Sequence, residues 1–284
     1  MQNAEEKWKL VEPVRLRLAQ LRPVAMSYVN PRFFIGDKPG LGKTVMSAGC
    51  VALYQSRERK AGRIPKKVLV VTDTSHVRGF AKEWESFGLP LMQFGGGKVQ
   101  IKRALKKQTL EDFDGVILNW DTLKTNAFIE FYIEHFEEFG MAVFDETSKL
   151  LNPKKSELYK MTNLIVNEYQ GGIERVIFLN GSSFENNIFD FYYQFAVLCP
   201  KLIPSKSFLE KHFVIREGRE ATDTDYYVQG SYMQVQHMLR FTGKIVDYKN
   251  QEVLRQKLKY YYIARSKSDY SSDIPEHSLS LIHI

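Results

Sequence analysis

Nine consecutive residues, Gly36–Thr44, have the clearest chemical pattern in the sequence: Gly-Asp-Lys-Pro-Gly-Leu-Gly-Lys-Thr. They follow a short apolar run and open a stretch of helical length, which is the context of a phosphate-binding loop. Glycines let backbone N–H groups curl around phosphate oxygens, and a helix N-terminus attracts negative charge. A glycine-rich turn that only caps a helix is the alternative, but Gly-x-Gly-Lys-Thr in this position favours phosphate binding.

The residues of this loop have separate expected tasks. Gly40 and Gly42 are expected to let the backbone approach the phosphates of ATP. Lys43 is expected to reach the β- and γ-phosphates, and the Thr44 hydroxyl to ligate Mg²⁺. The strict pattern has glycine where this chain has Asp37, so the loop is a variant of that pattern.

A pair of carboxylates, Asp145 and Glu146, directly follows the apolar run Met141–Phe144. In an ATPase, Asp145 would hold Mg²⁺ through water, and Glu146 would orient or deprotonate the attacking water. The alternative is an acidic pair at the N-terminus of the next helix, where negative charge is favourable. Because a phosphate loop lies upstream, we favour a catalytic set of Glu146, Asp145 and Lys43.

Five short apolar runs alternate with stretches of helical length around these motifs. The predicted strands are Phe33–Ile35, Val68–Thr72, Gly115–Asn119, Met141–Phe144 and Val176–Leu179. The predicted helices are Lys43–Arg57, His76–Phe87, Thr122–His135, Ser156–Asn167, Ser207–Phe213 and Gln251–Tyr262. Runs that are apolar throughout are typical of strands buried on both faces. The alternation therefore predicts an α/β fold, a parallel sheet with helices on both faces, whose ligands bind at the carboxyl ends of the strands.

Composition excludes several other classes of protein. The 284 residues are 44% hydrophobic and 26% charged, which is ordinary for a globular chain and rules out disordered, collagen-like and disulfide-stapled proteins. Apolar runs are all shorter than the ~20 residues needed to span a bilayer, so we expect no membrane segment. Cys50 and Cys199 lie far apart among apolar neighbours, which favours a buried, reduced pair and an intracellular location. The net charge of +7 suits a polyanionic partner without demonstrating one.

Taken in order, six segments resemble the Swi/Snf-like branch of the superfamily-two helicase ATPases. They are Asp37–Thr44, Val68–Glu83, Val116–Leu123, Asp145–Pro153, Phe178–Asp190 and Ala264–Pro275. The resemblance implies a P-loop RecA-like lobe that binds ATP and Mg²⁺ and acts on double-stranded DNA. The Asp-Glu-Thr-Ser variant at Asp145–Ser148 is similar to helicases of bacteriophages, which implies a phage protein in the cytoplasm of a bacterial host.

The same resemblance points to residues that touch the nucleic-acid strand. Contacts to the sugar-phosphate backbone of DNA need hydrogen-bond donors. The candidate donors lie at the carboxyl ends of the predicted strands. Thr72, Thr74 and Ser75 follow one predicted strand, and Asn119, Trp120 and Thr122 follow another; Thr74, Ser75, Asn119 and Trp120 are our candidates. A basic stretch over Lys98–Lys107 is interpreted as a solvated helix face rather than a second DNA contact.

Several positions depart from the family pattern. Ala25 stands where the family has the glutamine that reads adenine, which leaves selectivity for adenine open. Ser148 replaces the histidine that helps to couple hydrolysis to DNA binding in the family. Ser182 and Ser183 keep hydroxyls in the motif III segment, so coupling could survive, but Ser183 fits a helix N-cap equally well.

The resemblance runs from Leu21 to about Pro275 and implies one lobe, residues 1–275, where the family has two. We therefore expect a second RecA-like lobe in the full-length chain. The last six residues, Leu279–Ile284, resemble a translated sequencing adaptor, and a genuine apolar tail is the alternative. Two other functions stay open: a degenerate ATP-binding regulatory module without hydrolysis, and an RNA helicase of the same superfamily.

Overall fold

The computed structural model describes residues 16–95, 110–150, 156–181, 188–216, 245–266 and 268. The chain divides into two compact units: one is formed by the chain up to Leu198 together with the chain from Tyr260 onward, and the other by Cys199–Lys259. The first unit contains the sheet and all the predicted chemistry. The second is inserted in the sequence between the last large helix of the first unit and its edge strand.

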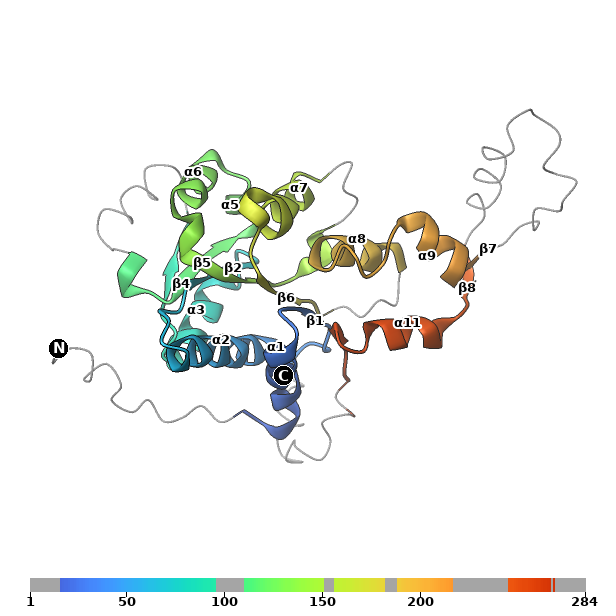
Figure 1. Cartoon of the computed structure of the whole chain (residues 1–284), viewed down its shortest axis with the longest axis horizontal. Coiled ribbons are helices and arrows are strands. Elements are labelled where there is room, and N and C mark those ends of the chain that lie inside the picture. Colours follow the sequence, from blue (N-terminus) through green and yellow to red (C-terminus); the bar gives the residue numbers. More distant parts are fainter. Residues whose placement is uncertain are drawn as a thin grey trace, which may run out of the picture. The chain divides into compact units, whose positions relative to one another are not determined.

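A single parallel sheet of seven strands forms the centre of the first unit, in the order β3-β4-β2-β5-β6-β1-β9 (Figure 1). The strands are β1 (Arg32–Ile35), β2 (Lys67–Thr72), β3 (Leu91–Gln93), β4 (Gly115–Asn119), β5 (Phe139–Phe144), β6 (Arg175–Leu179) and β9 (Tyr262–Ile263). All five predicted strands are present, and every pairing in this sheet is parallel. The predicted α/β class is therefore confirmed.

Helices cover both faces of this sheet, as the unbroken apolar runs of its strands require. They are α1 (Leu21–Val29), α2 (Lys43–Lys60), α3 (Val77–Ser86), α5 (Trp120–Leu123), α6 (Asn126–His135), α7 (Glu157–Asn163) and α8 (Ile188–Leu198). Figure 1 shows α1, α2 and α3 on one side of the sheet and α5, α6 and α7 on the other. Alternate strand residues thus face two cores, both shielded from water.

The two cores differ in composition. The core beneath α2 and α3 is largely aliphatic, with Val70, Val143 and Ile177 packed near Trp84. The opposite core is aromatic: Phe34 stacks on Phe195 with ring centroids 5.8 Å apart. The aromatic stretch Phe189–Phe195 contributes to this core, because Phe189, Phe191 and Phe195 are buried.

One predicted helix, Thr122–His135, is divided into two. The Asn119 side chain accepts a hydrogen bond from the Thr122 N–H and begins α5, and the Thr125 hydroxyl accepts one from the Phe128 N–H and begins α6. Side-chain caps of this kind compete with a continuous helix. The predicted helix Ser156–Asn167 begins as expected, because Ser156 caps α7, and continues into a wider turn over Leu164–Glu168.

The two outer strands and α1 were not predicted. β3 and β9 are only three and two residues long, and each pairs with one neighbour at an edge of the sheet. Strands this short have no periodicity to detect. The prediction of helix over Gln251–Tyr262 was wrong at its end, since the helix stops at Leu258 and Tyr262 belongs to β9.

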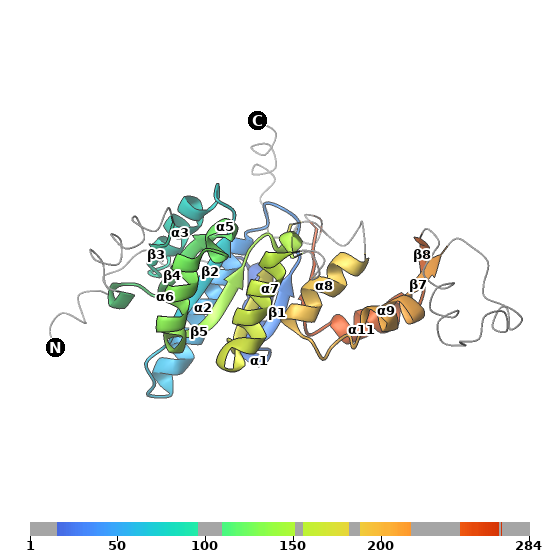
Figure 2. The same cartoon turned by 90° about the horizontal axis from the view of Figure 1, so that it is seen from above.

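The second unit is small and mixed. It contains α9 (Lys206–Phe213), the antiparallel strands β7 (Val214–Arg216) and β8 (Ile245–Tyr248), and α11 (Gln251–Leu258), all visible in Figure 2. Ser205 caps α9 by accepting a hydrogen bond from the Phe208 N–H, and Leu209 and Phe213 are buried. The predicted helix Ser207–Phe213 is therefore present.

Within the described ranges, no helix has both the length and the apolar character to cross a bilayer. The two cysteines lie in different units: Cys50 is buried and Cys199 is half-buried, and they are not bonded to each other.

The aromatic core provides a test of the fold. Phe34 is fully buried and packs against Phe178, Phe195 and Tyr262. We expect Phe34→Ala to lower the free energy of unfolding by ~3–5 kcal/mol, because it removes a large buried side chain and leaves a cavity. Ile64→Ala is the control, since Ile64 is 92% exposed. Equal urea midpoints for the two variants would contradict this assignment of the core.

Candidate nucleotide site

The glycine-rich loop lies between the end of β1 and the start of α2. Gly40 and Gly42 have φ values of +83° and +82°, a left-handed region that favours glycine. A side chain at Gly42 would also collide with Gln20, since an added Cβ would lie 2.5 Å from the Gln20 amide nitrogen. The backbone N–H groups of the first turn of α2 follow directly, so the loop has the geometry of an anion cradle.

Lys43 is the first residue of α2 and points back across the loop. Its ammonium group donates a hydrogen bond of 2.9 Å to the backbone carbonyl of Asp37. Burial lowers the pKa of Lys43, while the nearby charges of Asp145, Glu146 and Asp37 act in the opposite direction. Gly181, after β6, lies close by: a Cβ there would be 3.4 Å from the Lys43 nitrogen. The structure thus brings the predicted lysine and the predicted carboxylates together.

Two residues of α3 hydrogen-bond Thr44. The Trp84 indole N–H donates to the Thr44 carbonyl at 3.2 Å, and the Thr44 side chain hydrogen-bonds the Glu83 carboxyl. Burial raises the pKa of Glu83, and the bond to Thr44 partly offsets this effect. Glu83 is the last residue of the segment Val68–Glu83 that resembles the family pattern, and Trp84 follows it directly. Both residues fix the first turn of α2.

Asp145 directly follows β5 and is anchored by both its side chain and its backbone. The Thr72 hydroxyl donates to its carboxylate at 2.7 Å, and the Trp120 indole N–H donates to its carbonyl oxygen at 2.9 Å. Burial raises the pKa of the Asp145 carboxyl, although hydrogen bonds from Thr72 and Glu146 and the charges of His76 and Lys43 oppose the shift. A carboxylate desolvated in this way gains most from a bound cation.

Glu146 adopts a left-handed backbone conformation with φ of +53°. Non-glycine residues rarely occupy this region, and such strain is concentrated at functional sites. Burial, and then the charge of Asp145, raise the pKa of the Glu146 carboxyl. The next residue, Thr147, is fully buried and donates to Gln194 at 2.7 Å, which anchors the turn against α8.

The four predicted nucleic-acid residues have different surroundings. Thr74 and Ser75 are exposed on the turn after β2, with hydroxyls available to a ligand. Trp120 is only 2% exposed and its indole N–H bonds the Asp145 carbonyl, so this side chain is buried rather than presented to a nucleic-acid strand. The Asn119 carboxamide oxygen is used as the cap of α5. Thr72 is also fully buried.

The exposed turn after β2 is bonded to the loop after β5. Lys149 forms an ion pair with Asp73, and the His76 imidazole nitrogen lies 3.9 Å from the Asp145 carboxylate. Ser148 is half-buried in the short turn Thr147–Lys149, next to these contacts. Among the other predictions, Ser182, Ser183 and the whole stretch Lys98–Lys107 lie outside the described residues, and Ala25 is exposed on α1.

Sequence reasoning missed two residues that contact the loop. The Arg265 guanidinium pairs with the fully buried Asp37 carboxylate at 2.6 Å. The Gln20 side-chain amide donates to the Leu41 carbonyl at 3.2 Å. The departure of Asp37 from glycine was a visible signal that something must neutralise its charge, but its partner is 228 positions away.

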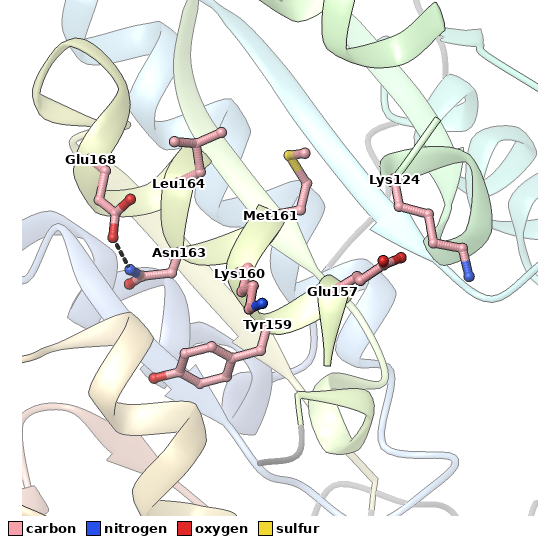
Figure 3. A pocket seen from close by; sticks show the side chains of 8 residues that line it. All are labelled: Lys124, Glu157, Tyr159, Lys160, Met161, Asn163, Leu164 and Glu168. Carbon is pink, nitrogen blue, oxygen red and sulfur yellow. Dashed lines mark hydrogen bonds between the residues drawn. The ribbon is translucent and has the colours of Figure 1, made fainter. Parts of the chain in front are cut away.

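A hollow of about 600 Å³ lies elsewhere, along α7 and the turn that follows it (Figure 3). Its lining mixes both charges, with Lys124 and Lys160 opposed by Glu157 and Glu168. Two of the lining residues bond each other, since the Asn163 side-chain amide donates to the Glu168 carboxylate at 2.6 Å (Figure 3). None of the loop or acidic-pair residues lines this hollow, so it is separate from the nucleotide site.

A parallel sheet with a glycine-rich loop after β1 and an acidic pair after β5 is the arrangement of a RecA-like lobe. More narrowly, the chain belongs to the SNF2-related domain family, whose pattern matches residues 29–284.

Solved structures agree in fold. The SWI2/SNF2 ATPase core of Sulfolobus solfataricus in complex with dsDNA is similar with a TM-score of 0.61 and 19% identity, over 92% of this chain and 47% of that one. A second structure, the Sulfolobus solfataricus SWI2/SNF2 ATPase core domain, is similar with a TM-score of 0.59 and 20% identity, over 92% of this chain and 46% of that one. The chain thus spans about half the length of these structures. Comparison with curated proteins gave no match.

The burial of Asp145 predicts a pH-dependent stability. The folded chain binds the proton of this carboxyl more tightly than the unfolded chain does, so stability falls as pH rises from the ordinary value of 3.8 to the raised folded value. Asp145→Asn should therefore raise the melting temperature at pH 7 without nucleotide or metal, and the gain should vanish at low pH. Asp121→Asn is the control, because that carboxylate is 80% exposed. A lower melting temperature for Asp145→Asn at pH 7 would refute this reading.

Proposed function

We propose that this chain is the ATP-binding lobe of a DNA-dependent ATPase that couples ATP hydrolysis to translocation on double-stranded DNA. The observation that carries the proposal is the convergence of Lys43, Asp145 and Glu146 at one edge of the sheet. Membership of the SNF2-related domain family supports the use of a nucleotide with Mg²⁺.

The residues at this edge fit a magnesium nucleotide. The left-handed glycines Gly40 and Gly42 keep the loop open to phosphate oxygens, and the N-terminus of α2 faces them. Lys43 would exchange its bond to a backbone carbonyl for a bond to the β- and γ-phosphates. Thr44 and Asp145 would hold the metal, and the buried Asp145 carboxylate would regain there the charge compensation that burial removes.

Bound Mg-ATP would supply the reactive γ-phosphoryl group and neutralise charge as it transfers. Glu146 would orient or deprotonate the attacking water, since it follows Asp145 directly and its raised pKa makes it a better proton acceptor than an exposed glutamate. The strained backbone at Glu146 turns the chain between the metal-binding and water-activating positions.

DNA would be bound through its backbone. The exposed hydroxyls of Thr74 and Ser75 suit phosphate oxygens, and contacts of this type carry no sequence information. The similar archaeal core was solved in complex with dsDNA, which supports duplex DNA as the partner. Asn119 and Trp120 would act from beneath this surface, and Ser148, Ser182 and Ser183 remain our proposed coupling residues.

The proposal includes a second RecA-like lobe outside this sequence, because the chain spans 47% of the similar archaeal core. Arginine fingers supplied from outside a P-loop site are worth ~10³–10⁵ in rate. We propose a phage origin and a bacterial cytoplasmic setting on the motif resemblance alone.

The 284 residues alone should bind Mg-ATP weakly and hydrolyse it poorly. Rapid DNA-stimulated ATP turnover by this chain in a phosphate-release assay would overturn that expectation.

The decisive comparison uses the full-length protein. Glu146→Gln should reduce DNA-stimulated ATP turnover at least ~100-fold while leaving Mg-ATP binding intact, because it removes the water-activating carboxylate and keeps the phosphate contacts. Lys43→Ala should lose binding as well. If wild type and Glu146→Gln turn over ATP equally slowly, the chain is a regulatory ATP-binding module instead. Stronger stimulation by duplex RNA than by duplex DNA would favour an RNA helicase.

A further inference from the structure

A buried ion pair joins the phosphate loop to the far end of the chain. Asp37 is the second residue of the loop, and its side chain is fully buried. The Arg265 guanidinium meets this carboxylate with two nitrogens, at 3.1 Å and 2.6 Å, and the Arg265 side chain is 10% exposed. A two-point contact of this kind fixes orientation as well as distance.

The same segment also holds the loop through its backbone. The Gly36 N–H donates to the Ile263 carbonyl at 2.6 Å, and the Lys38 N–H donates to the Arg265 carbonyl at 3.0 Å. The Tyr262 ring covers Gly36 so closely that a Cβ there would lie 2.6 Å from it. Three successive residues at the start of the loop are therefore held by β9 and by Arg265, which lies shortly after it.

Arg265 extends this support beyond the loop. A third guanidinium bond goes to the carbonyl of Ala19, just before the Gln20 side chain that bonds Leu41. One arginine thus connects the turn before α1 with the start of the phosphate loop, and Gln20 continues the contact to its centre. The first and last described parts of this unit meet at the residues that would bind phosphate.

Asp37 carries a negative charge beside the place where a negatively charged phosphate would bind, so this charge must be neutralised. The Asp37 carbonyl already accepts a bond from Lys43, and its carboxylate is near enough to act on the Lys43 charge. Without a partner, this buried negative charge would oppose the triphosphate and compete with it for Lys43. A buried carboxylate left unpaired would also drive the loop to rearrange toward water.

We propose that Arg265 is a positioning residue for ATP: it neutralises the buried Asp37 carboxylate and fixes the phosphate loop in its binding geometry. The inference rests on the proposed nucleotide site. It also explains how this loop tolerates an aspartate where the strict pattern has glycine. Arg265 does not touch the phosphates itself; it acts through Asp37 and the backbone of Gly36–Lys38.

The test measures the dissociation constant for Mg-ATP with a fluorescent ATP analogue on the 284-residue chain. Arg265→Gln should weaken binding at least about tenfold, because it strands the Asp37 carboxylate beside the phosphates. The double variant Asp37→Asn with Arg265→Gln should return to within about threefold of wild type, since no unpaired charge remains. A double variant that binds Mg-ATP as weakly as Arg265→Gln would overturn the proposal.

Arg63→Gln is the matched control. Arg63 makes an equally close two-point pair with Glu58, at 2.6 and 2.9 Å, but with its side chain 62% exposed and near the opposite end of α2. The Arg63→Gln variant should bind Mg-ATP as tightly as wild type. If Arg265→Gln does so too, the proposal fails.

Two further variants separate the possible failures. If Arg265→Gln does not fold, Arg265→Lys keeps the charge but replaces the two-point contact with one, and should still weaken binding by about threefold or more. Wild-type affinity for Arg265→Lys would then refute the positioning role. Lys43→Ala tests the site itself: if it binds Mg-ATP as tightly as wild type, the proposed nucleotide site is wrong and the inference falls with it.

Discussion

The parallel alignment of β1, β6, β5 and β2 is the constraint on which the rest of the structure depends. Because all four strands run the same way, their carboxyl ends meet at one edge, and the loops that follow them share one small volume. β6 separates the phosphate loop after β1 from the acidic pair after β5, and Gly181 at the end of β6 leaves room for Lys43. A side chain there would intrude on the space that the ammonium group uses.

Burial of both faces of the sheet makes this edge a place of weak solvation. Lys43, Asp145 and Glu146 all have pKa values displaced in the direction that disfavours charge. Such an arrangement is costly without a ligand, and it is stabilised locally by short contacts such as the Thr72 hydroxyl on Asp145. Keeping these charges in a weakly solvated place lowers the stability of the fold. The left-handed backbone of Glu146 lowers it as well, because non-glycine residues rarely adopt that conformation.

Much of the fold was predictable because its strands are local and strongly apolar. Gly115–Asn119 was predicted with its observed bounds, since its first four residues are buried and give an unambiguous apolar run. Prediction failed where short elements depend on a neighbour, as in β9, and where caps at Asn119 and Thr125 divide one periodic stretch. The division of the chain at Cys199–Lys259 was also not predicted, because no Pro- or Gly-rich linker marks it.

For the site, the sequence by itself determined the phosphate loop and the acidic pair, since both are contiguous motifs whose chemistry lies in residues one or two positions apart. Only the tertiary structure decided which neighbouring side chains face the site and which support it. Thr72 ends β2 and Trp120 follows β4, so both lie at the edge of the sheet where the site is. Both are nevertheless buried, and both hydrogen-bond Asp145. The pairing of Asp37 with Arg265 spans 228 positions, and a contact between residues so distant exists only once the chain has folded.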